Sequence, residues 1–138
     1  VHRLKQEFPH LEIVINGGIQ SLDEASAQLQ HVDGVMIGRE AYHNPWILAE
    51  ADRKLFGDDH PTPTRHQILE QMMPFIESEF ANGTPIGRIT RHILGLFHGQ
   101  PGAKAWRRHI SENAHRKGAT PDLIMQAAAN IASNRQPY

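Results

Sequence analysis

The sequence predicts an α/β segment followed by an all-α domain, and three observations indicate this. Two short, apolar, β-branched runs, residues 12–18 and 33–39, each stop at glycine. The 16 residues between them, Gly17 to Val32, are enough for the helical crossover that a parallel strand pair needs. Beyond residue 60 the strand signals stop, and segments with clear helix starts follow.

The two apolar runs are typical of strands that are buried on both faces. Ser21 is placed to cap the helix between them, and Glu24, three residues later, would complete a capping box. Neighbouring parallel strands end at the same edge of a sheet, so the two glycine turns are expected side by side. Their backbone N–H groups and a nearby arginine would form a cradle for a phosphate group.

The cradle is expected to consist of Asn16, Gly17, Gly18, Gly38 and Arg39. A single glycine after a strand is more often a tight turn with positive φ. Two such turns in succession, the second followed by Arg39, favour a phosphate site, because (β/α)8 barrels bind phosphate after their last two strands. Asn16 either orients the first turn through its side chain or adopts a left-handed conformation there.

A polar connector broken by prolines, residues 57–63, predicts a boundary between domains 1–60 and 61–138. Before it, Asn44 and Pro45 predict an N-cap and a first helical turn, and Gly57 predicts a helix end. After it, helices are expected over residues 64–81 (kinked at Pro74), 84–98, 101–118 and 120–133, packed as a four-helix bundle. The residues expected to line its core are Ile68, Met72, Phe75, Ile76, Phe80, Ile86, Ile89, Ile93, Leu94, Phe97, Trp106, Ile110, Ala114, Leu123, Ile124, Ala127, Ala128 and Ile131.

Charge is distributed unevenly along the chain. Residues 1–60 hold five Lys/Arg and ten Asp/Glu, a net charge of −5, and residues 61–138 hold nine and five, a net charge of +4, which sum to the overall −1. This asymmetry predicts that the second half faces an anionic partner. Five residues carry the prediction: Arg88, Arg91, Lys104, Arg107 and Arg108. The spacing of the last three places them on one side of one helix, which is either a nucleic-acid contact or an ordinary solvated face.

Several classes of protein are disfavoured. The chain has no cysteine, so it holds neither a disulfide framework nor a cysteine nucleophile, and its histidines lack the paired spacing of metal ligands. No apolar run approaches the length of a membrane span and no signal peptide is visible, so a soluble, cytoplasmic protein is expected. Because the chain starts at Val1, inside what reads as the end of a helix, we interpret it as a fragment.

Two blocks of sequence resemble the tRNA-dihydrouridine synthase family. Residues 13–19 (IVINGGI) and 33–46 (DGVMIGREAYHNPW) are similar to the end of its flavin-binding barrel. Residues 91–99 (RHILGLFHG) and 101–111 (PGAKAWRRHIS) are similar to the helical domain of the A-type subfamily. The resemblance covers essentially the whole chain.

The resemblance implies the last two strands of a TIM (β/α)8 barrel, followed by a helical tRNA-binding domain. It further implies an FMN-dependent enzyme that uses NADPH to reduce uridine to 5,6-dihydrouridine in the tRNA D-loop. Asn16, Gly17, Gly18, Gly38 and Arg39 match the family's contacts to the FMN phosphate. Lys104 and Arg107 match positions that meet tRNA, whereas Arg108, Arg91 and Arg88 are added from charge alone.

In this family the general acid is a cysteine, which is expected upstream of this chain, so the chain alone is predicted to be inactive. Two other functions stay open. A different flavin- or phosphate-binding barrel enzyme, acting on a small metabolite, would need only the glycine cradle and would leave the basic helices unexplained. A nonenzymatic RNA-binding module would need only the helices.

Overall fold

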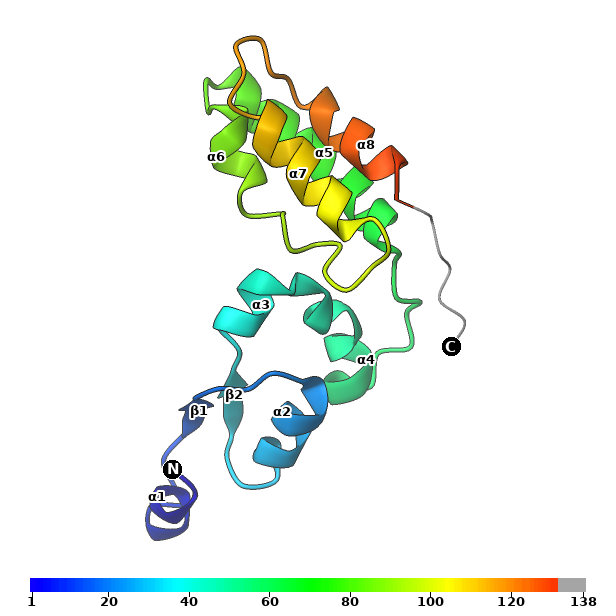
Figure 1. The fold of residues 1–138 in the computed structure, drawn as a ribbon. Helices are drawn as coiled ribbons and strands as arrows, with labels where there is room; N and C mark the ends of the chain where they lie inside the picture. The colour runs from blue at the N-terminus through cyan, green and yellow to red at the C-terminus, as the bar shows by residue number, and fades with distance from the viewer. Residues whose placement is uncertain (132–138) are drawn as a thin grey trace. The chain divides into compact units, whose positions relative to one another are not determined.

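The computed structural model describes residues 1–131 and divides into two compact units between Thr62 and Pro63. The first unit contains α1 (His2–Glu7), β1 (Val14–Asn16), α2 (Leu22–Leu29), β2 (Gly34–Met36), α3 (Arg39–His43), the 3-10 helix η1 (Pro45–Glu50) and α4 (Ala51–Phe56). The second contains α5 (Arg65–Ala81), α6 (Ile86–Thr90), α7 (Ala103–Asn113) and α8 (Asp122–Ala129). Figure 1 shows both units. The chain is therefore mixed α/β and mostly helical.

The sheet of the first unit has two parallel strands, as predicted. β1 and β2 pair with Val14 opposite Gly34, and α2 forms the crossover between them. The prediction that both faces are buried is wrong, because Val14 is 51% exposed and Met36 is 47% exposed. Within residues 1–131 no third strand joins the sheet; Ile13 and Val32, which precede the strands, are buried, whereas Ile15 and Val35 are half-buried.

Two predicted caps in the first unit differ from the structure. The Ser21 hydroxyl accepts a 3.1 Å hydrogen bond from the Glu24 N–H, as expected, but the Glu24 carboxylate binds the N–H of Gln20, so the box is incomplete. Asn44 does not cap the following helix. Its N–H closes α3 on the Glu40 carbonyl, and its side-chain amide donates to the Glu40 carboxylate. Gly57 ends α4 with a left-handed φ of 70°, as predicted.

The first helix of the second unit has the predicted limits. α5 begins with a full capping box, in which the Thr64 hydroxyl accepts from the Gln67 N–H and the Gln67 side chain accepts from the Thr64 N–H. The T-x-x-Q spacing was present in the sequence and is a signature of this box. At the same end of α5, the Nε of Arg65 donates to the Leu96 carbonyl at 2.9 Å, and burial lowers the pKa of Arg65. This bond joins the start of α5 to the segment after α6.

The second predicted helix, residues 84–98, is wrong over most of its length. Only Ile86–Thr90 is α-helical, and residues 91–100 form successive tight turns, with hydrogen bonds from Ile93 to Thr90 and from Leu96 to Ile93. Glycine has low helix propensity, and two glycines fall in this segment. Gly99 has φ of +74°, which a right-handed helix does not allow.

The last two helices are also shorter than predicted. Gly102 and Gly118 have φ of +91° and +83°, so α7 is confined to the residues between them. Its N-cap is Gly102 itself. α8 ends at Ala129, and the predicted helical residues 132 and 133 lie outside the described part of the chain.

The core of the second unit is centred on Trp106, which is fully buried. Its indole N–H donates to the Leu94 carbonyl at 3.1 Å, and its ring meets Phe97 edge-on at 4.8 Å between centroids. The core residues predicted for α7 and α8 are confirmed. On α5 the prediction of Ile76 is confirmed and that of Phe75 is wrong, because Phe75 is 63% exposed; Leu69, which was not predicted, is buried together with Ile76. Those two are seven residues apart and share a face that Phe75, next to Ile76, does not.

We expect Trp106→Ala to lower the free energy of unfolding of the second unit by about 3–5 kcal/mol, because it leaves a cavity and removes the bond to the Leu94 carbonyl. Trp106→Phe should have a smaller effect, since it keeps most of the apolar volume. Urea unfolding followed by circular dichroism measures both. Equal, small effects of the two variants would show that this ring does not support the core.

Candidate functional site

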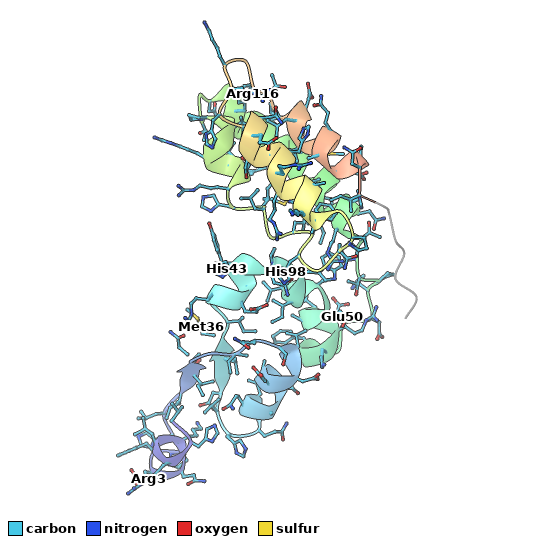
Figure 2. The ribbon with its side chains drawn as sticks, viewed as in Figure 1. Arg3, Met36, His43, Glu50, His98 and Arg116 are labelled. Carbon is cyan, nitrogen blue, oxygen red and sulfur yellow. The ribbon has the colours of Figure 1, made fainter. Side chains whose placement is uncertain are left out.

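A cavity of about 610 Å³ lies where the two strands of the first unit end. All five residues predicted to form the phosphate cradle line it, so the structure brings the two glycine turns together. The lining residues are Asn16, Gly17, Gly18, Ile19, Gln20, Met36, Gly38, Arg39, Glu40 and His43. Met36 and His43 are labelled in Figure 2.

The two turns are built differently. Gly18 has φ of +65°, so this position favours glycine on conformational grounds. Among the described residues only glycines have positive φ, so Asn16 is not left-handed, and its predicted role as an orienting side chain is the alternative that is left. Gly38 has φ of −102° and precedes α3, where Arg39 is the first helical residue. The backbone of the glycine turns and the Arg39 side chain thus line the same cavity.

Sequence reasoning missed three polar residues of this cavity: Gln20, Glu40 and His43. The N–H of Gln20 is held by the Glu24 carboxylate, and Nδ1 of His43 lies 2.8 Å from the Arg39 carbonyl. His43 follows Arg39 by four residues, so helical spacing alone would have placed it on the same side of α3. The cavity therefore offers an exposed guanidinium, an imidazole and glycine backbone, groups that suit a phosphate, together with the Glu40 carboxylate, which accepts a hydrogen bond from the Asn44 amide.

The strands that carry this cavity are joined at their starts by Asp33. Its carboxylate accepts from the N–H of Ile13 at 2.8 Å and from the Lys5 ammonium at 2.7 Å, and its own N–H donates to the Ile13 carbonyl. The Lys5 ammonium also donates to the carbonyls of Pro9 and Leu11. The hydrogen bond from Lys5, and then that from Ile13, lower the pKa of Asp33.

The second group of predicted residues lies on the second unit. Lys104, Arg107 and Arg108 are exposed on α7, outside its buried stripe of Trp106 and Ile110. The structure therefore places these three cations together on one helix face, in solvent. Within residues 1–131, none of the three forms an ion pair with a carboxylate.

Arg88 and Arg91, the other two predicted cations, are exposed at α6 and just after it. Nε of Arg91 donates to the His92 ring at 3.1 Å. Both arginines line a second cavity, of about 600 Å³, rather than the face of α7.

Two further searches cover the described residues. Residues 1–131 contain no cluster of three or more His, Asp or Glu arranged to hold a metal ion. Nor is any described helix long and apolar enough to cross a membrane.

Comparison with known proteins shows which family these features belong to. The model of the dihydrouridine synthase (Dus) family matches residues 1–133. The chain belongs to the dihydrouridine synthase family. It is 55% identical over 130 residues to the tRNA-dihydrouridine(20/20a) synthase of Vibrio cholerae, covering 94% of this chain and 40% of that protein. It is 53% identical over 135 residues to the tRNA-dihydrouridine(20/20a) synthase of Escherichia coli K12, covering 98% of this chain and 39% of that protein.

The chain thus spans about 40% of the length of the curated relatives it matches. The matched region, residues 1–133, includes both the glycine-lined cavity and the basic face of α7.

The Asp33 contacts predict a pH dependence of stability. Because its pKa is lower in the folded chain than the ordinary 3.8, its contribution is present above about pH 3.8 and is lost as the pH falls through the folded pKa. Asp33→Asn should lower the urea midpoint at pH 7 and flatten its fall below pH 4. Asp59→Asn, which neutralises an exposed carboxylate in the connector, is the control and should keep the wild-type profile. An unchanged profile for Asp33→Asn would remove this carboxylate from the acid response.

Proposed function

We propose that this chain is the C-terminal part of an FMN-dependent tRNA-dihydrouridine synthase of the A-type subfamily. The complete protein would reduce uridine to 5,6-dihydrouridine in the tRNA D-loop, with NADPH as reductant. The observation that carries the proposal is the cavity that joins both glycine turns to Arg39, in a chain 55% identical to a protein named for this activity. In this proposal β1 and β2 are the last two strands of a TIM barrel, and α5 to α8 form the helical tRNA-binding domain.

The glycine-lined cavity fits the phosphate end of FMN. Its volume of about 610 Å³ accommodates the phosphate of FMN and the adjoining part of the cofactor, and the exposed Arg39 guanidinium supplies the charge opposite to that of the phosphate. Gly17 and Gly18 have open space where a Cβ would stand, so a ligand can approach their backbone closely. FMN, when bound, supplies the redox chemistry, and the residues of this chain hold its phosphate.

The basic face of α7 fits a tRNA backbone. Lys104, Arg107 and Arg108 are exposed and, among the described residues, have no carboxylate partner that would have to be displaced. Lysine and arginine clusters of this kind bind phosphates and release counterions. Such contacts set the position and orientation of a nucleic acid, which decides the uridine that reaches an active site.

Proton donation to the uracil ring is assigned to a residue outside this chain. Reduction of the ring needs a positioned acid beside the base, and the sequence contains no cysteine, the acid that the family resemblance implies. We therefore place catalysis in the longer protein and binding in this part of it. Base extrusion is expected, because a base stacked in a helix cannot present its ring face to a flavin.

The full-length protein, purified and mixed with NADPH and unmodified tRNA transcript, should form dihydrouridine, detected as a mass gain of two hydrogen atoms in one D-loop nucleotide. Gly18→Val should lower the flavin-to-protein ratio, because valine strains a position with φ of +65° beside the cavity. Gly57→Val introduces similar strain at φ of +70° away from the cavity and should keep the flavin. A protein without flavin and without activity on tRNA would leave the chain as an RNA-binding module or another barrel enzyme.

The double variant Lys104→Ala/Arg107→Ala should weaken tRNA binding by the full-length protein. Each lost phosphate contact lowers the slope of log K against log salt by about 1, so the slope should fall by about 2. Arg3→Ala, which removes a highly exposed cation from α1, is the control and should change neither affinity nor slope. Filter binding at several salt concentrations measures both. An unchanged slope in the double variant would exclude this face from the interface.

A further inference from the structure

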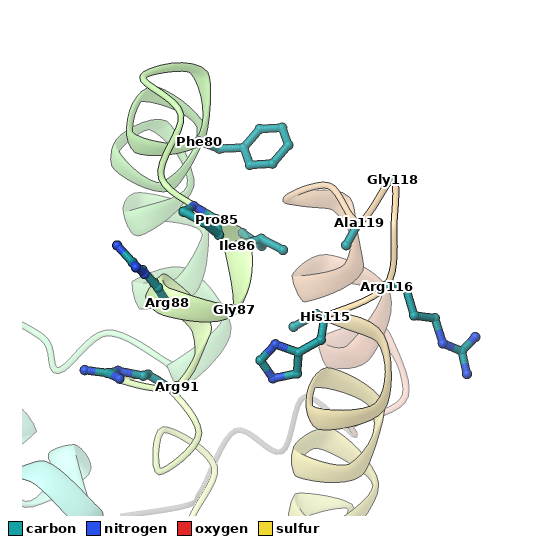
Figure 3. A pocket seen from close by; sticks show the side chains of 11 residues that line it. Phe80, Pro85, Ile86, Gly87, Arg88, Arg91, His115, Arg116, Gly118 and Ala119 are labelled. Atoms are coloured by element: carbon teal, nitrogen blue, oxygen red, sulfur yellow. The ribbon is translucent and has the colours of Figure 1, made fainter.

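The second cavity of about 600 Å³ is not used by any role assigned so far. It lies within the second unit, between the end of α5 with α6 on one side and the turn after α7 on the other (Figure 3). The residues that line it are Phe80, Pro85, Ile86, Gly87, Arg88, Arg91, Ala114, His115, Arg116, Gly118 and Ala119. Its walls are mostly apolar, and its charged groups are all arginines.

The inner walls offer two ring faces. Phe80 is only half-buried although it is a large apolar side chain, and Figure 3 shows its ring directed toward the cavity. The imidazole of His115 faces Gly87 from the other side. A Cβ on Gly87 would stand 2.8 Å from Cε1 of His115, so glycine at this position lets the ring lie against the backbone.

The rim carries the charge. Arg88 and Arg91 extend side by side from the α6 segment and Arg116 extends from the opposite wall, and all three side chains are directed outward, away from the cavity (Figure 3). None of the described residues that line the cavity is acidic. The site is therefore an apolar slot with aromatic faces inside and guanidinium groups outside, which is how proteins hold an unstacked nucleobase and its phosphates.

The basic face of α7 continues toward this cavity. Lys104, Arg108, Ser111 and His115 follow one another at spacings of four, three and four residues, and Ala114 keeps the right-handed backbone past the helix end. A strand whose phosphates lie on Lys104 and Arg108 would thus reach the slot along one surface.

We propose that this cavity is a nucleobase slot, in which one unpaired base of the RNA stacks against Phe80 and His115 while its flanking phosphates lie on Arg88 and Arg91. The inference deepens the proposed function and rests on it, because it adds a base contact to a surface that was assigned phosphate contacts only. A phosphate site alone would need the arginines but not the ring-lined, apolar interior. The slot would give the helical unit a way to distinguish an unpaired loop nucleotide from a duplex.

The first experiment compares two probes of equal charge on the full-length protein: hexaadenylate, which lacks the uracil that the proposed active site takes, and an abasic hexamer with the same ribose-phosphate backbone. Stacking of one base strengthens binding by about fivefold to a hundredfold. We therefore expect hexaadenylate to bind at least fivefold more tightly, and Phe80→Leu to abolish that difference. Equal binding of the two hexamers by the wild-type protein would overturn the slot.

The second experiment measures tRNA binding by the variants. Phe80→Leu removes the ring and keeps an apolar side chain, so affinity should fall at least fivefold with an unchanged salt slope. Arg88→Ala/Arg91→Ala should lower affinity and reduce the slope by about 2. Phe75→Leu is the matched control on the same helix, since Phe75 is exposed and does not line the cavity, and it should bind as the wild type.

His115→Ala is a second variant for the hexamer comparison, which can be used if Phe80→Leu does not fold. His115 is exposed, so removal of its ring should not disturb the core. A hexamer preference that survives both Phe80→Leu and His115→Ala would place the base contact elsewhere and overturn the proposal. Loss of the slot alone is distinguished from failure of the proposed function by the double variant Lys104→Ala/Arg107→Ala. If that variant weakens tRNA binding while the wild-type protein binds the two hexamers equally, only the slot is wrong. If the variant binds tRNA as the wild type does and the two hexamers also bind equally, the tRNA role itself is wrong.

Discussion

The constraint on which the first unit depends is the parallel pairing of two very short strands. Only three residues in each strand pair with the other strand, so the contacts just before the strands help to hold the two strands in register. Asp33 and Ile13 form hydrogen bonds in both directions. The Lys5 ammonium binds the Asp33 carboxylate and also donates to two carbonyls of the loop before β1. This arrangement sets the register, and the register places both glycine turns at one edge. The first cavity forms at that edge, between the two glycine turns.

The second unit depends on a different interaction, the burial of Trp106 against Phe97. Because α7 directs its apolar stripe inward, its cations are left on the opposite face, so one amphipathic helix supplies both the core and the charged surface. The turns after α6 are held by the same core, through the bond from Trp106 to the Leu94 carbonyl and that from Arg65 to the Leu96 carbonyl. Those turns carry Arg91 to the second cavity.

Both units offer cations to phosphate, but in different ways. The first unit is acidic overall and presents one arginine beside glycine backbone, which suits a single phosphate group held in a defined place. The second is basic overall and spreads its cations along a helix face and around a slot, which suits an extended polyanion. The proposed function would use both kinds of surface, because it requires the binding of a small cofactor and of a large RNA.

The sequence by itself determined the parallel strand pair, the crossover helix, the start of α5 and the exposed face of α7, because each follows from local periodicity or capping. It determined less where glycine and tertiary contacts compete with helix propensity. The sequence predicts a helix over residues 91–98, but these residues form tight turns, in which Ile93, Leu96 and Phe97 are buried. The predicted cradle residues meet at one cavity, whereas Gln20, Glu40 and the slot around Phe80 and His115 emerged only from the fold. Residues that line a cavity from separate elements share no spacing in the sequence, so only the tertiary structure could bring them together.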